Sequence, residues 1–447
     1  MIEFLRMLDI SLFGILGFYA KDTNMDSFDR DTSNDHDDAV PDWWEDGIRT
    51  DVDIVAFWNE NMMGAEGSGN PIIKKDDYRK YDSGDTIKMN VSEKIFGDGV
   101  TGENKLEGNE DTYSIGQFSF TVDDFRNGIA YTQKFKREVN YPTQVHFQRL
   151  LTDWTAVRND DLIFNEMING STSPRSLYGN DAASVDALND GDHLGTNEID
   201  KVKLALQRLG AQPFETPYGY CYGLVIDEIS EYRLKGDTLW NQANREAGPR
   251  SYKENALFKG SMMGKYGKVL GIWNGVVVYV YNSIRSGATL RGTYLRPEAQ
   301  VVSAHTAGAS TLVVGTNNNK NYLKYWPSSG KVYIQAEGSN TAEEVAYSAK
   351  ANNYTLTLSG TSSYNHGVGA ICTYYESVSR CIGFGAESVA YGYGMPITRI
   401  DNARDYGYVK GMGIHGVNGA KLIEDSNSAI PNVVILNVKA FNPSNTI

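Results

Sequence analysis

The residues that most often carry enzyme chemistry are scattered along this sequence. None of its six histidines belongs to an HExxH zinc motif or stands beside a nucleophile signature: His36, His146, His193, His305, His366 and His415. Ser261 lies one residue too early in the Gly260–Gly264 segment to form a GxSxG nucleophile elbow. Two carboxylates that are distant in the sequence can still meet in space, as they do in glycoside hydrolases. The spacing of these residues therefore favours a protein that is not an enzyme, with no catalytic residue assigned.

Carboxylates and histidines that stand close together are the candidate ligands for a metal ion. Asp190, Asp192 and His193 could form such a set, but their polar surroundings favour a solvated loop. Asp227 and Glu228 follow an apolar run and could form an acid/base couple, yet the helical pattern after them favours charges at a helix N-terminus. A phosphate-binding loop is also excluded, because no Gly-Lys-Ser/Thr follows the glycines near the C-terminus. We expect no cofactor and no metal site.

The overall composition limits the class of protein. With 447 residues the chain is long enough for two or three domains with well-filled cores. A net charge of −14 argues against sequence-specific nucleic acid binding, which needs clustered cations, although acidity also serves solubility. Three cysteines outside any CxxC pair (Cys221, Cys372 and Cys381) indicate neither a disulfide framework nor a zinc site. A reducing compartment is the simplest expectation.

Residues 1–46 are expected to form an extended, acidic N-terminal arm. The apolar run 10–19 is too short to span a bilayer, and acidic residues dilute the positive flank of a secretion signal. Residues 1–24 could also precede the true start of the protein, at Met25. The aspartates of the arm lack the glycine and glutamate positions of a calcium loop. Trp43, Trp44 and Phe57 could anchor the arm on a partner or pack on their own domain.

A long β-hairpin is predicted between residues 84 and 122. Apolar residues alternate over 87–91 and again over 113–115, and the phase then shifts to Phe118 and Phe120, which suggests a β-bulge at Gly116. The segment between the strands is long, polar and rich in glycine. A compact domain seldom carries such a loop without a use for it, and one use is to lie on another molecule.

Helical periodicity begins after the hairpin. Phe147, Leu150, Leu151, Trp154 and Val157 recur at three- and four-residue spacing, which predicts a helix over 142–168 with Pro142 in its first turn. A second amphipathic helix is expected to begin with Thr196 as N-cap and to end at Gly210. Buried strands are predicted at 220–226 and 276–281.

Two further segments read as β-structure. Residues 297–372 contain five short β-branched runs separated by turn residues, which predicts an inserted small barrel or sandwich. Residues 383–422 combine nine glycines with four tyrosines, so close backbone approach and large flat side chains occur together. The simplest interpretation of this block is a bulged strand pair, with tight sheet corners against a neighbouring surface.

The order of these segments resembles the major capsid protein of tailed bacteriophages, with the Hong Kong 97-type fold, and is closest to the coat-protein family of N-four-like podophages. The resemblance covers roughly residues 40–445. It rests on Gly84-Asp85, the hairpin tip 97–110, the helix segment 150–154 and the block that starts at Gly383. No single motif is specific to this family, and the resemblance depends on the order of the segments.

The resemblance implies an α+β fold and a division of the chain into domains. The expected parts are an arm (1–46), a peripheral domain (47–83 and 119–200) with the spine helix 142–168, an extended loop (84–118), an axial domain (201–296 and 373–440), the inserted β domain (297–372) and a tail (441–447). The residues expected at contacts between subunits are Phe96, Val100, Lys105, Leu106 and Glu107 in the extended loop and Trp43 and Trp44 in the arm. Phe147, Leu150, Leu151 and Trp154 are expected to form the spine helix.

The implied function is self-assembly into an icosahedral head shell that encloses DNA. The expected partners are identical copies arranged in hexamers and pentamers, together with portal, scaffold and decoration proteins, and no membrane. The protein would be made in the host cytoplasm and reside in the virion. Some relatives crosslink through a lysine and an asparagine, and Lys105 lies on the loop where such a lysine would stand. An encapsulin-like cargo shell and a secreted polysaccharide hydrolase remain as alternatives.

Overall fold

A computed structural model of the chain describes residues 56–58, 62–77, 86–92, 99–103, 105–108, 110, 115–138, 143–170, 175–216, 219–246, 262–263, 267–281, 293–315, 323–335, 342–375, 378–423 and 432–440. All of them belong to the second of two compact units, Ile48–Ile447. The N-terminal arm, with Trp43 and Trp44, lies outside the described residues, as do Pro142 and the tail 441–447. Mixed strands and helices give the α+β class that the sequence predicts.

The first sheet is built around a long hairpin of two strands, β19 (Val389–Arg404) and β20 (Val409–Leu422). Its strand order is β1-β2-β19-β20-β5, where β1 is Met63–Gly64, β2 is Ile72–Lys74 and β5 is Asp123–Thr132. The register of β19 against β20 shifts on both sides of Met395, so the predicted bulged strand pair is confirmed. The short helix α3 (Gln133–Glu138) follows β5 directly.

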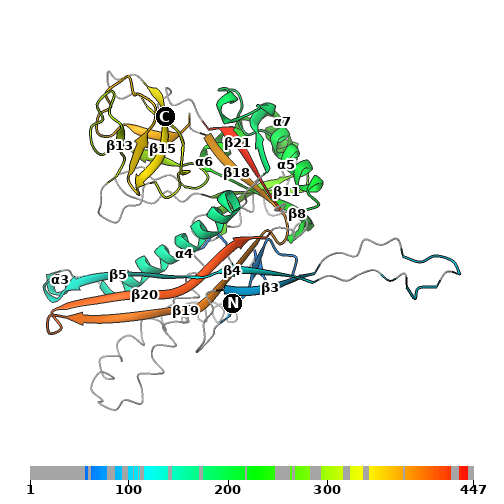
Figure 1. Ribbon diagram of the computed structural model, residues 1–447, viewed down its shortest axis with the longest axis horizontal. Helices are drawn as coiled ribbons and strands as arrows, with labels where there is room; N and C mark the ends of the chain where they lie inside the picture. Colours follow the sequence, from blue (N-terminus) through cyan, green and yellow to red (C-terminus); the bar gives the residue numbers. More distant parts are fainter. Residues whose placement is uncertain are drawn as a thin grey trace, which may run out of the picture. The chain divides into compact units, whose positions relative to one another are not determined.

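The predicted long helix is α4 (Thr143–Asn169), which packs on β20, β19 and β5 (Figure 1). Leu151 of α4 lies with Met412 and Ile414 of β20 in the largest buried cluster. Further along the helix, Phe164 stacks on Phe57 at 5.9 Å between ring centroids. Phe57 therefore packs within its own unit and does not anchor the arm on a partner.

A second sheet has the strand order β6-β21-β18-β8-β11-β10-β9. Its strands are β6 (Arg175–Tyr178), β8 (Gly219–Ile226), β9 (Met262–Met263), β10 (Gly267–Trp273), β11 (Val276–Tyr281), β18 (Val378–Phe384) and β21 (Val433–Lys439), and β7 (Phe214–Thr216) pairs with β8. Val225 of β8 packs in the cluster that contains α4, whereas Leu224 and Ile226 pack in a second cluster. Burial on both faces explains why β8 and β11 are continuous apolar runs in the sequence.

Helices cover the face of this sheet that carries the second cluster. They are α5 (Thr196–Arg208), α6 (Glu228–Gly236) and α7 (Thr238–Glu246). Two short 3-10 helices, Gly179–Asp181 and Val185–Ala187, lie between β6 and α5 in the sequence. The predicted N-cap of α5 is wrong by one residue, because Gly195 is the cap. Thr196 instead donates from its backbone N and its Oγ1 to the Asp237 carboxylate, at 2.7 and 2.9 Å. Gly210 follows the last helical turn with a φ of +75°, as its predicted role at the helix end requires.

A third sheet of six strands occupies the range of the predicted insertion. Its order is β12-β17-β14-β15-β16-β13, with β12 Glu298–Gln300, β13 Thr311–Val313, β14 Gly330–Ile334, β15 Glu343–Asn352, β16 Thr355–Leu358 and β17 Ile371–Tyr374. Neighbouring strands are antiparallel. Val302, just after β12, donates its N–H to the carbonyl of Val313 at 3.1 Å, so the two edges of the sheet meet as in a small barrel. The buried apolar side chains of this sheet form a cluster of their own.

The segment 373–440 does not stay in one sheet. Strands β18 and β21 pair within the second sheet, whereas β19 and β20 pair with β2 and β5 in the first. The segment expected in the axial domain therefore contributes strands to two sheets. The long hairpin shares its sheet with elements assigned to the peripheral domain.

Candidate assembly surfaces

The predicted hairpin is formed by β3 (Thr86–Ser92) and β4 (Ile115–Thr121). Ile87 lies opposite Phe120 and Met89 opposite Phe118, in a continuous antiparallel register from Thr86 to Ser92. The bulge predicted at Gly116 is therefore wrong, because this glycine simply pairs with Val91. Ile87, Met89 and Phe120 are buried in a small apolar cluster. This cluster fixes the root of the hairpin to the rest of the unit.

The tip of the hairpin exposes most of its side chains. In the described residues 99–103, 105–108 and 110, only Val100 is partly buried. Leu106 is 61% exposed between the exposed Lys105 and Glu107. Phe96, the remaining loop residue expected at a contact, lies outside the described residues. A loop with an exposed leucine and a root fixed in an apolar cluster is suited to contact another molecule.

The four residues expected in the spine helix divide between two environments. Phe147 and Leu151 are buried, and Trp154 is partly buried against the same cluster. Leu150 is 43% exposed, so it does not belong to the buried stripe that the sequence predicts. The exposed Val145 lies on the same helix. The helix thus combines a core-facing side with two large apolar side chains that the described residues leave uncovered.

Polar side chains of α4 fix the elements that surround it. The Asp160 carboxylate is fully buried and accepts the backbone N–H groups of Phe57 and Trp58, at 3.0 and 3.1 Å. Arg158 donates to Asn418 Oδ1 at 2.6 Å, and its guanidinium lies 4.2 Å from the centroid of the Phe125 ring. Burial lowers the pKa of Arg158, whose charge still fits this cation–π contact.

The glycine and tyrosine block makes the close contacts that its composition predicts. Tyr391 and Tyr393 are buried at the centre of the sheet, and their hydroxyls bond to Asn418 and Asn159 at 3.1 and 2.8 Å. Burial, together with the neighbouring tyrosine, raises the pKa of Tyr391 well above its ordinary value. At Gly392 an added Cβ would lie 2.0 Å from the carbonyl oxygen of Lys75. Tyr391, Tyr393 and Gly392 therefore serve packing within one chain, whereas Tyr406 and Tyr408 of the same block are exposed.

The Asp227-Glu228 pair proves to be part of an ion cluster around Arg296. Asp227 caps α6 by accepting the Ser230 N–H at 3.0 Å, as predicted for a helix N-terminus. Arg296 contacts Asp227 at 3.0 Å, Glu228, and Glu298 at 2.8 Å. Burial raises the pKa of Glu298 despite the neighbouring cation. Burial alone would lower the pKa of Arg296, but the three surrounding carboxylates together outweigh it and raise that pKa. Because Arg296 occupies the centre of the cluster, the carboxylates form a structural link and not an acid/base couple.

One serine–histidine contact has the distance of a catalytic pair. His305 Nε2 lies 2.8 Å from the Ser362 Oγ. Ser362 is only 2% exposed and already accepts the Gly308 N–H, and the His305 Nδ1 faces the Thr311 carbonyl at 3.0 Å. A substrate could not reach such a hydroxyl. These bonds therefore brace the loops of the third sheet.

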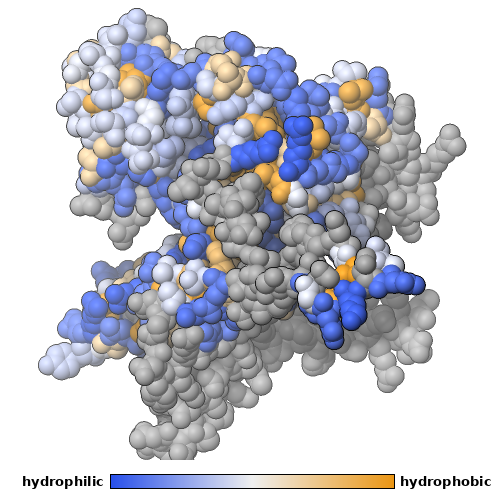
Figure 2. Space-filling view, turned by 45° about the vertical axis from the view of Figure 1, so that its right-hand side comes forward, coloured by the Kyte–Doolittle hydropathy of each residue, from blue (hydrophilic) through white to orange (hydrophobic). Residues whose placement is uncertain are grey.

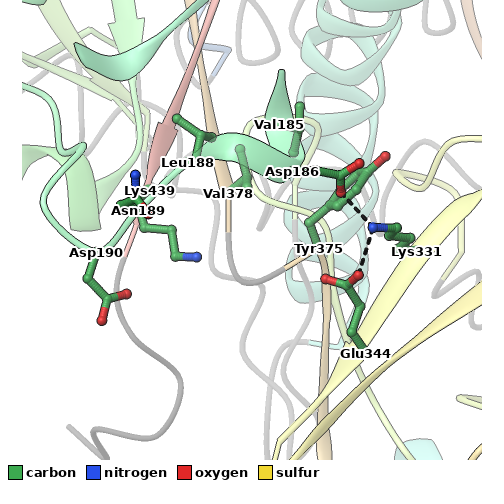
Figure 3. A pocket seen from close by; sticks show the side chains of 10 residues that line it. All are labelled: Val185, Asp186, Leu188, Asn189, Asp190, Lys331, Glu344, Tyr375, Val378 and Lys439. Carbon is green, nitrogen blue, oxygen red and sulfur yellow. Dashed lines mark hydrogen bonds and ion pairs between the residues drawn. The ribbon is translucent and has the colours of Figure 1, made fainter. Parts of the chain in front are cut away.

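A polar pocket of about 500 Å³ lies between the second and third sheets, lined by Asp186, Asp190, Lys331, Glu344 and Lys439 among others. Figure 3 shows Lys331 between Asp186 and Glu344, with ion pairs of 2.8 and 2.9 Å. The hydrogen bond that Lys331 donates to Asp186 is the main cause that raises the pKa of Lys331. Asp190 and Lys439 line the other side of the pocket. The Lys331 charge is thus compensated by two carboxylates, as expected for a junction between segments.

The other candidate ligands are not assembled into a metal site. Asp192 accepts the backbone N–H of Asn189 at 2.7 Å, and His193 Nδ1 lies 2.9 Å from the carbonyl oxygen of Lys439. No group of three or more His, Cys, Asp or Glu residues within the described ranges could hold a metal ion. The three cysteines are free and buried. No helix among the described residues is long and apolar enough to cross a membrane.

Surface composition is consistent with association through small mixed contacts. On the face that Figure 2 presents, hydrophilic side chains cover most of the described surface, and the apolar areas are small and separate. The exposed large apolar side chains include Leu106, Phe135, Leu150 and Tyr406. Sequence reasoning missed α3 and the Arg296 cluster, whereas Tyr406 belongs to the glycine and tyrosine block that it singled out. The basic and aromatic run QKFKRE at 133–138 was the signal that could have pointed to α3.

Comparisons with known proteins agree with this arrangement. Residues 52–202, which include β3, β4, β5 and α4, match the family model described as phage capsid protein. The structure is similar to the capsid of Ralstonia phage GP4, with 14% identity, a TM-score of 0.56, and coverage of 88% of this chain and 93% of that one.

Two other solved structures show a comparable likeness. The Cyanophage Pam1 capsid has 13% identity and a TM-score of 0.53, with 88% of this chain and 93% of that chain covered. The capsid of Helicobacter pylori bacteriophage KHP30 has 12% identity and a TM-score of 0.51, with 85% and 89% covered. No curated protein matches the sequence. At these identities the likeness concerns the fold, and the chain has the α+β fold of phage capsid proteins.

Proposed function

We propose that this chain is the major capsid protein of a tailed bacteriophage and that its copies associate into a closed icosahedral head shell around packaged DNA. The observation that carries the proposal is the match of residues 52–202 to the phage capsid family, in a chain with a capsid fold over most of its length. The sequence resemblance to Hong Kong 97-type coat proteins, closest to the N-four-like podophage family, supports a finer assignment. Neither comparison favours the polysaccharide hydrolase alternative.

The β3–β4 hairpin is the element proposed to join neighbouring subunits. Its root is held by Ile87, Met89 and Phe120, whereas Val100, Lys105, Leu106 and Glu107 stand at the tip. A contact made by a loop adds little area to any one pair of subunits. Repeated in a closed array, many such contacts act together and give a stable container.

The domains proposed for the chain are assigned here by sheet, so that β19 and β20 are grouped with the first sheet. The peripheral domain would contain α4 and the first sheet, including β19 and β20, and the axial domain would contain the second sheet with α5, α6 and α7. The six-stranded sheet would be an inserted domain. Residues 1–46 would form the arm, with Trp43 and Trp44 as its anchors, and Phe96 would complete the contact residues of the loop.

The partners proposed for assembly are identical copies in hexamers and pentamers, a portal, a scaffold and decoration proteins on the inserted sheet. A structural protein of this kind needs no catalytic site. Its net charge of −14 would reduce adhesion to the packaged genome. The subunit would be made in the host cytoplasm and reside in the virion.

Deletion of residues 94–112, with a short glycine linker in their place, tests the proposal. Because the root cluster of the hairpin lies outside the deleted segment, the variant should remain folded. We expect wild-type protein to give shells by negative-stain microscopy and the deletion variant to elute as a soluble subunit with an unchanged circular dichroism spectrum. Normal shells from the deletion variant would refute the role of the hairpin.

A further inference from the structure

An exposed basic and aromatic surface lies where α3 meets the turn between β19 and β20. The N–H of Gln133 donates to the carbonyl of Tyr408 at 2.9 Å, and its side-chain Nε2 donates to that of Gly407 at 3.3 Å. These bonds hold helix and turn together as one surface, which we call the basic end and define as residues 133–138 and 404–410. Figure 1 shows α3 beside this turn.

The basic end exposes three aromatic side chains. Phe135 and Tyr408 are 43% and 42% exposed, and Tyr406 is fully exposed. Tyr406 also has a φ of +51°, a left-handed conformation that is uncommon for a bulky residue. Backbone strain of this kind persists where the surroundings or a function maintain it, and here it presents an aromatic ring to solvent.

The charge of the basic end is opposite to that of the whole chain. Five cations (Lys134, Lys136, Arg137, Arg404 and Lys410) accompany only two carboxylates (Glu138 and Asp405), in a protein with a net charge of −14. Lys134 pairs with Glu138 at 3.7 Å. Lys136, Arg404 and Lys410 form no ion pair within the part of the chain that the structure describes. Their charges are therefore available to a partner.

The tip of the β3–β4 hairpin has complementary chemistry. Its described residues carry three exposed carboxylates, Glu103, Glu107 and Glu110, and one cation, Lys105. Leu106 is 61% exposed in the middle of them. An acidic loop with a central apolar side chain matches a basic surface that carries exposed aromatic rings.

We propose that the basic end receives the acidic hairpin tip of a second copy of this chain. The inference rests on the proposed function and names the surface that the loop contacts. A contact within one copy conflicts with the topology. The chain passes from the tip through β4 into β5, whose ten residues extend about 33 Å before α3 begins at the far end. Donor and acceptor are then different surfaces of each subunit, so the contact is heterologous and can repeat around a ring.

Charge reversal with rescue tests this contact directly. One variant reverses the tip (Glu103→Lys, Glu107→Lys and Glu110→Lys), a second reverses the basic end (Lys136→Glu, Arg404→Glu and Lys410→Glu), and a third combines all six changes. A matched control reverses three exposed cations elsewhere: Lys88→Glu on β3, Arg126→Glu on β5 and Arg208→Glu on α5. All variants are expressed as the full chain and checked for folding by circular dichroism. Shells are then counted by negative-stain microscopy.

We expect either reversal alone to lower the yield of shells at least tenfold, the combined variant to recover most of it, and the control to assemble like wild type. Folded single variants that assemble normally, or a combined variant that recovers nothing, would overturn the inference. So would a basic-end variant that assembles normally but loses binding to a DNA duplex, because the basic end would then be a nucleic acid surface. If wild-type protein forms no shells, the proposed function itself fails.

Discussion

Gly392 gives a quantitative test of the packing between the strand that precedes the hairpin and the glycine and tyrosine block. In Gly392→Ala the new Cβ would lie 2.0 Å from the carbonyl oxygen of Lys75, whereas ordinary contact begins at 3.4 Å. The backbone at Lys75 must therefore move by about 1.4 Å, the difference between these two distances. That movement opposes the bonds from Lys75 N to the Tyr391 carbonyl at 2.9 Å and from Asp77 N to the Tyr393 carbonyl at 3.0 Å.

The expected cost of Gly392→Ala is about 3 kcal/mol of unfolding free energy, because overpacking costs 1–3 kcal/mol and two backbone hydrogen bonds are weakened. Gly411→Ala is a matched control in the partner strand, since its added Cβ would meet nothing closer than 3.6 Å. Removing backbone freedom at such a site should leave stability unchanged or raise it by up to about 1 kcal/mol.

Urea unfolding of the unassembled subunit, followed by tryptophan fluorescence, measures both variants. The equilibrium constant for unfolding should rise more than a hundredfold for Gly392→Ala, which follows from about 3 kcal/mol. Equal midpoints for the two alanine variants would refute the close approach at Gly392.

Three further tests concern the stability of the folded subunit and its assembly. Asp237→Asn should cost about 1–2 kcal/mol at neutral pH, because hydrogen bonds from Thr196 and from the start of α7 outweigh burial and lower the pKa of Asp237. The stability that Asp237 contributes is present above about pH 3.8 and is lost as the pH falls through its folded pKa. The unfolding free energies of variant and wild type, measured by urea titration, should therefore converge in acid. A difference between them that persists in acid would contradict this role of Asp237. Leu150→Glu should reduce shell yield without changing the unfolding midpoint, because Leu150 is exposed. Leu151→Ala, at the buried neighbour, should cost about 2–5 kcal/mol of unfolding free energy. The opposite pattern would contradict the assignment of Leu150 to the exposed face of α4 and Leu151 to the buried face. The three buried thiols should resist a thiol reagent until urea unfolds the chain, since burial raises the pKa of Cys372 and Cys381, and rapid labelling of native protein would count against their burial.

The sequence predicts individual elements of this fold well where local pattern determines them. Apolar residues of α4 recur at helical spacing from Phe147 to Val157, and the six residues of β11 form a β-branched and aromatic run that favours a buried strand. The phase change near Gly116 was misleading. Phe118 and Phe120 face Met89 and Ile87 in a regular register, and no extra residue is required.

Long-range pairing could not be predicted from the sequence. Strand β20 pairs with β5, so His415 lies opposite Arg126. No residue pattern in either strand indicates that the other is its partner. The exposure of Leu150 has the same origin, because helical spacing places it near Leu151 but does not say which face a sheet will cover. The basic end is likewise formed only when β20 brings its turn to α3.

Negative-stain electron microscopy of the overexpressed full chain tests the central claim most directly. The proposal predicts closed particles of uniform diameter, built from this polypeptide. A preparation that contains only folded, dispersed monomers, at high subunit concentration and with scaffold protein supplied, would contradict it.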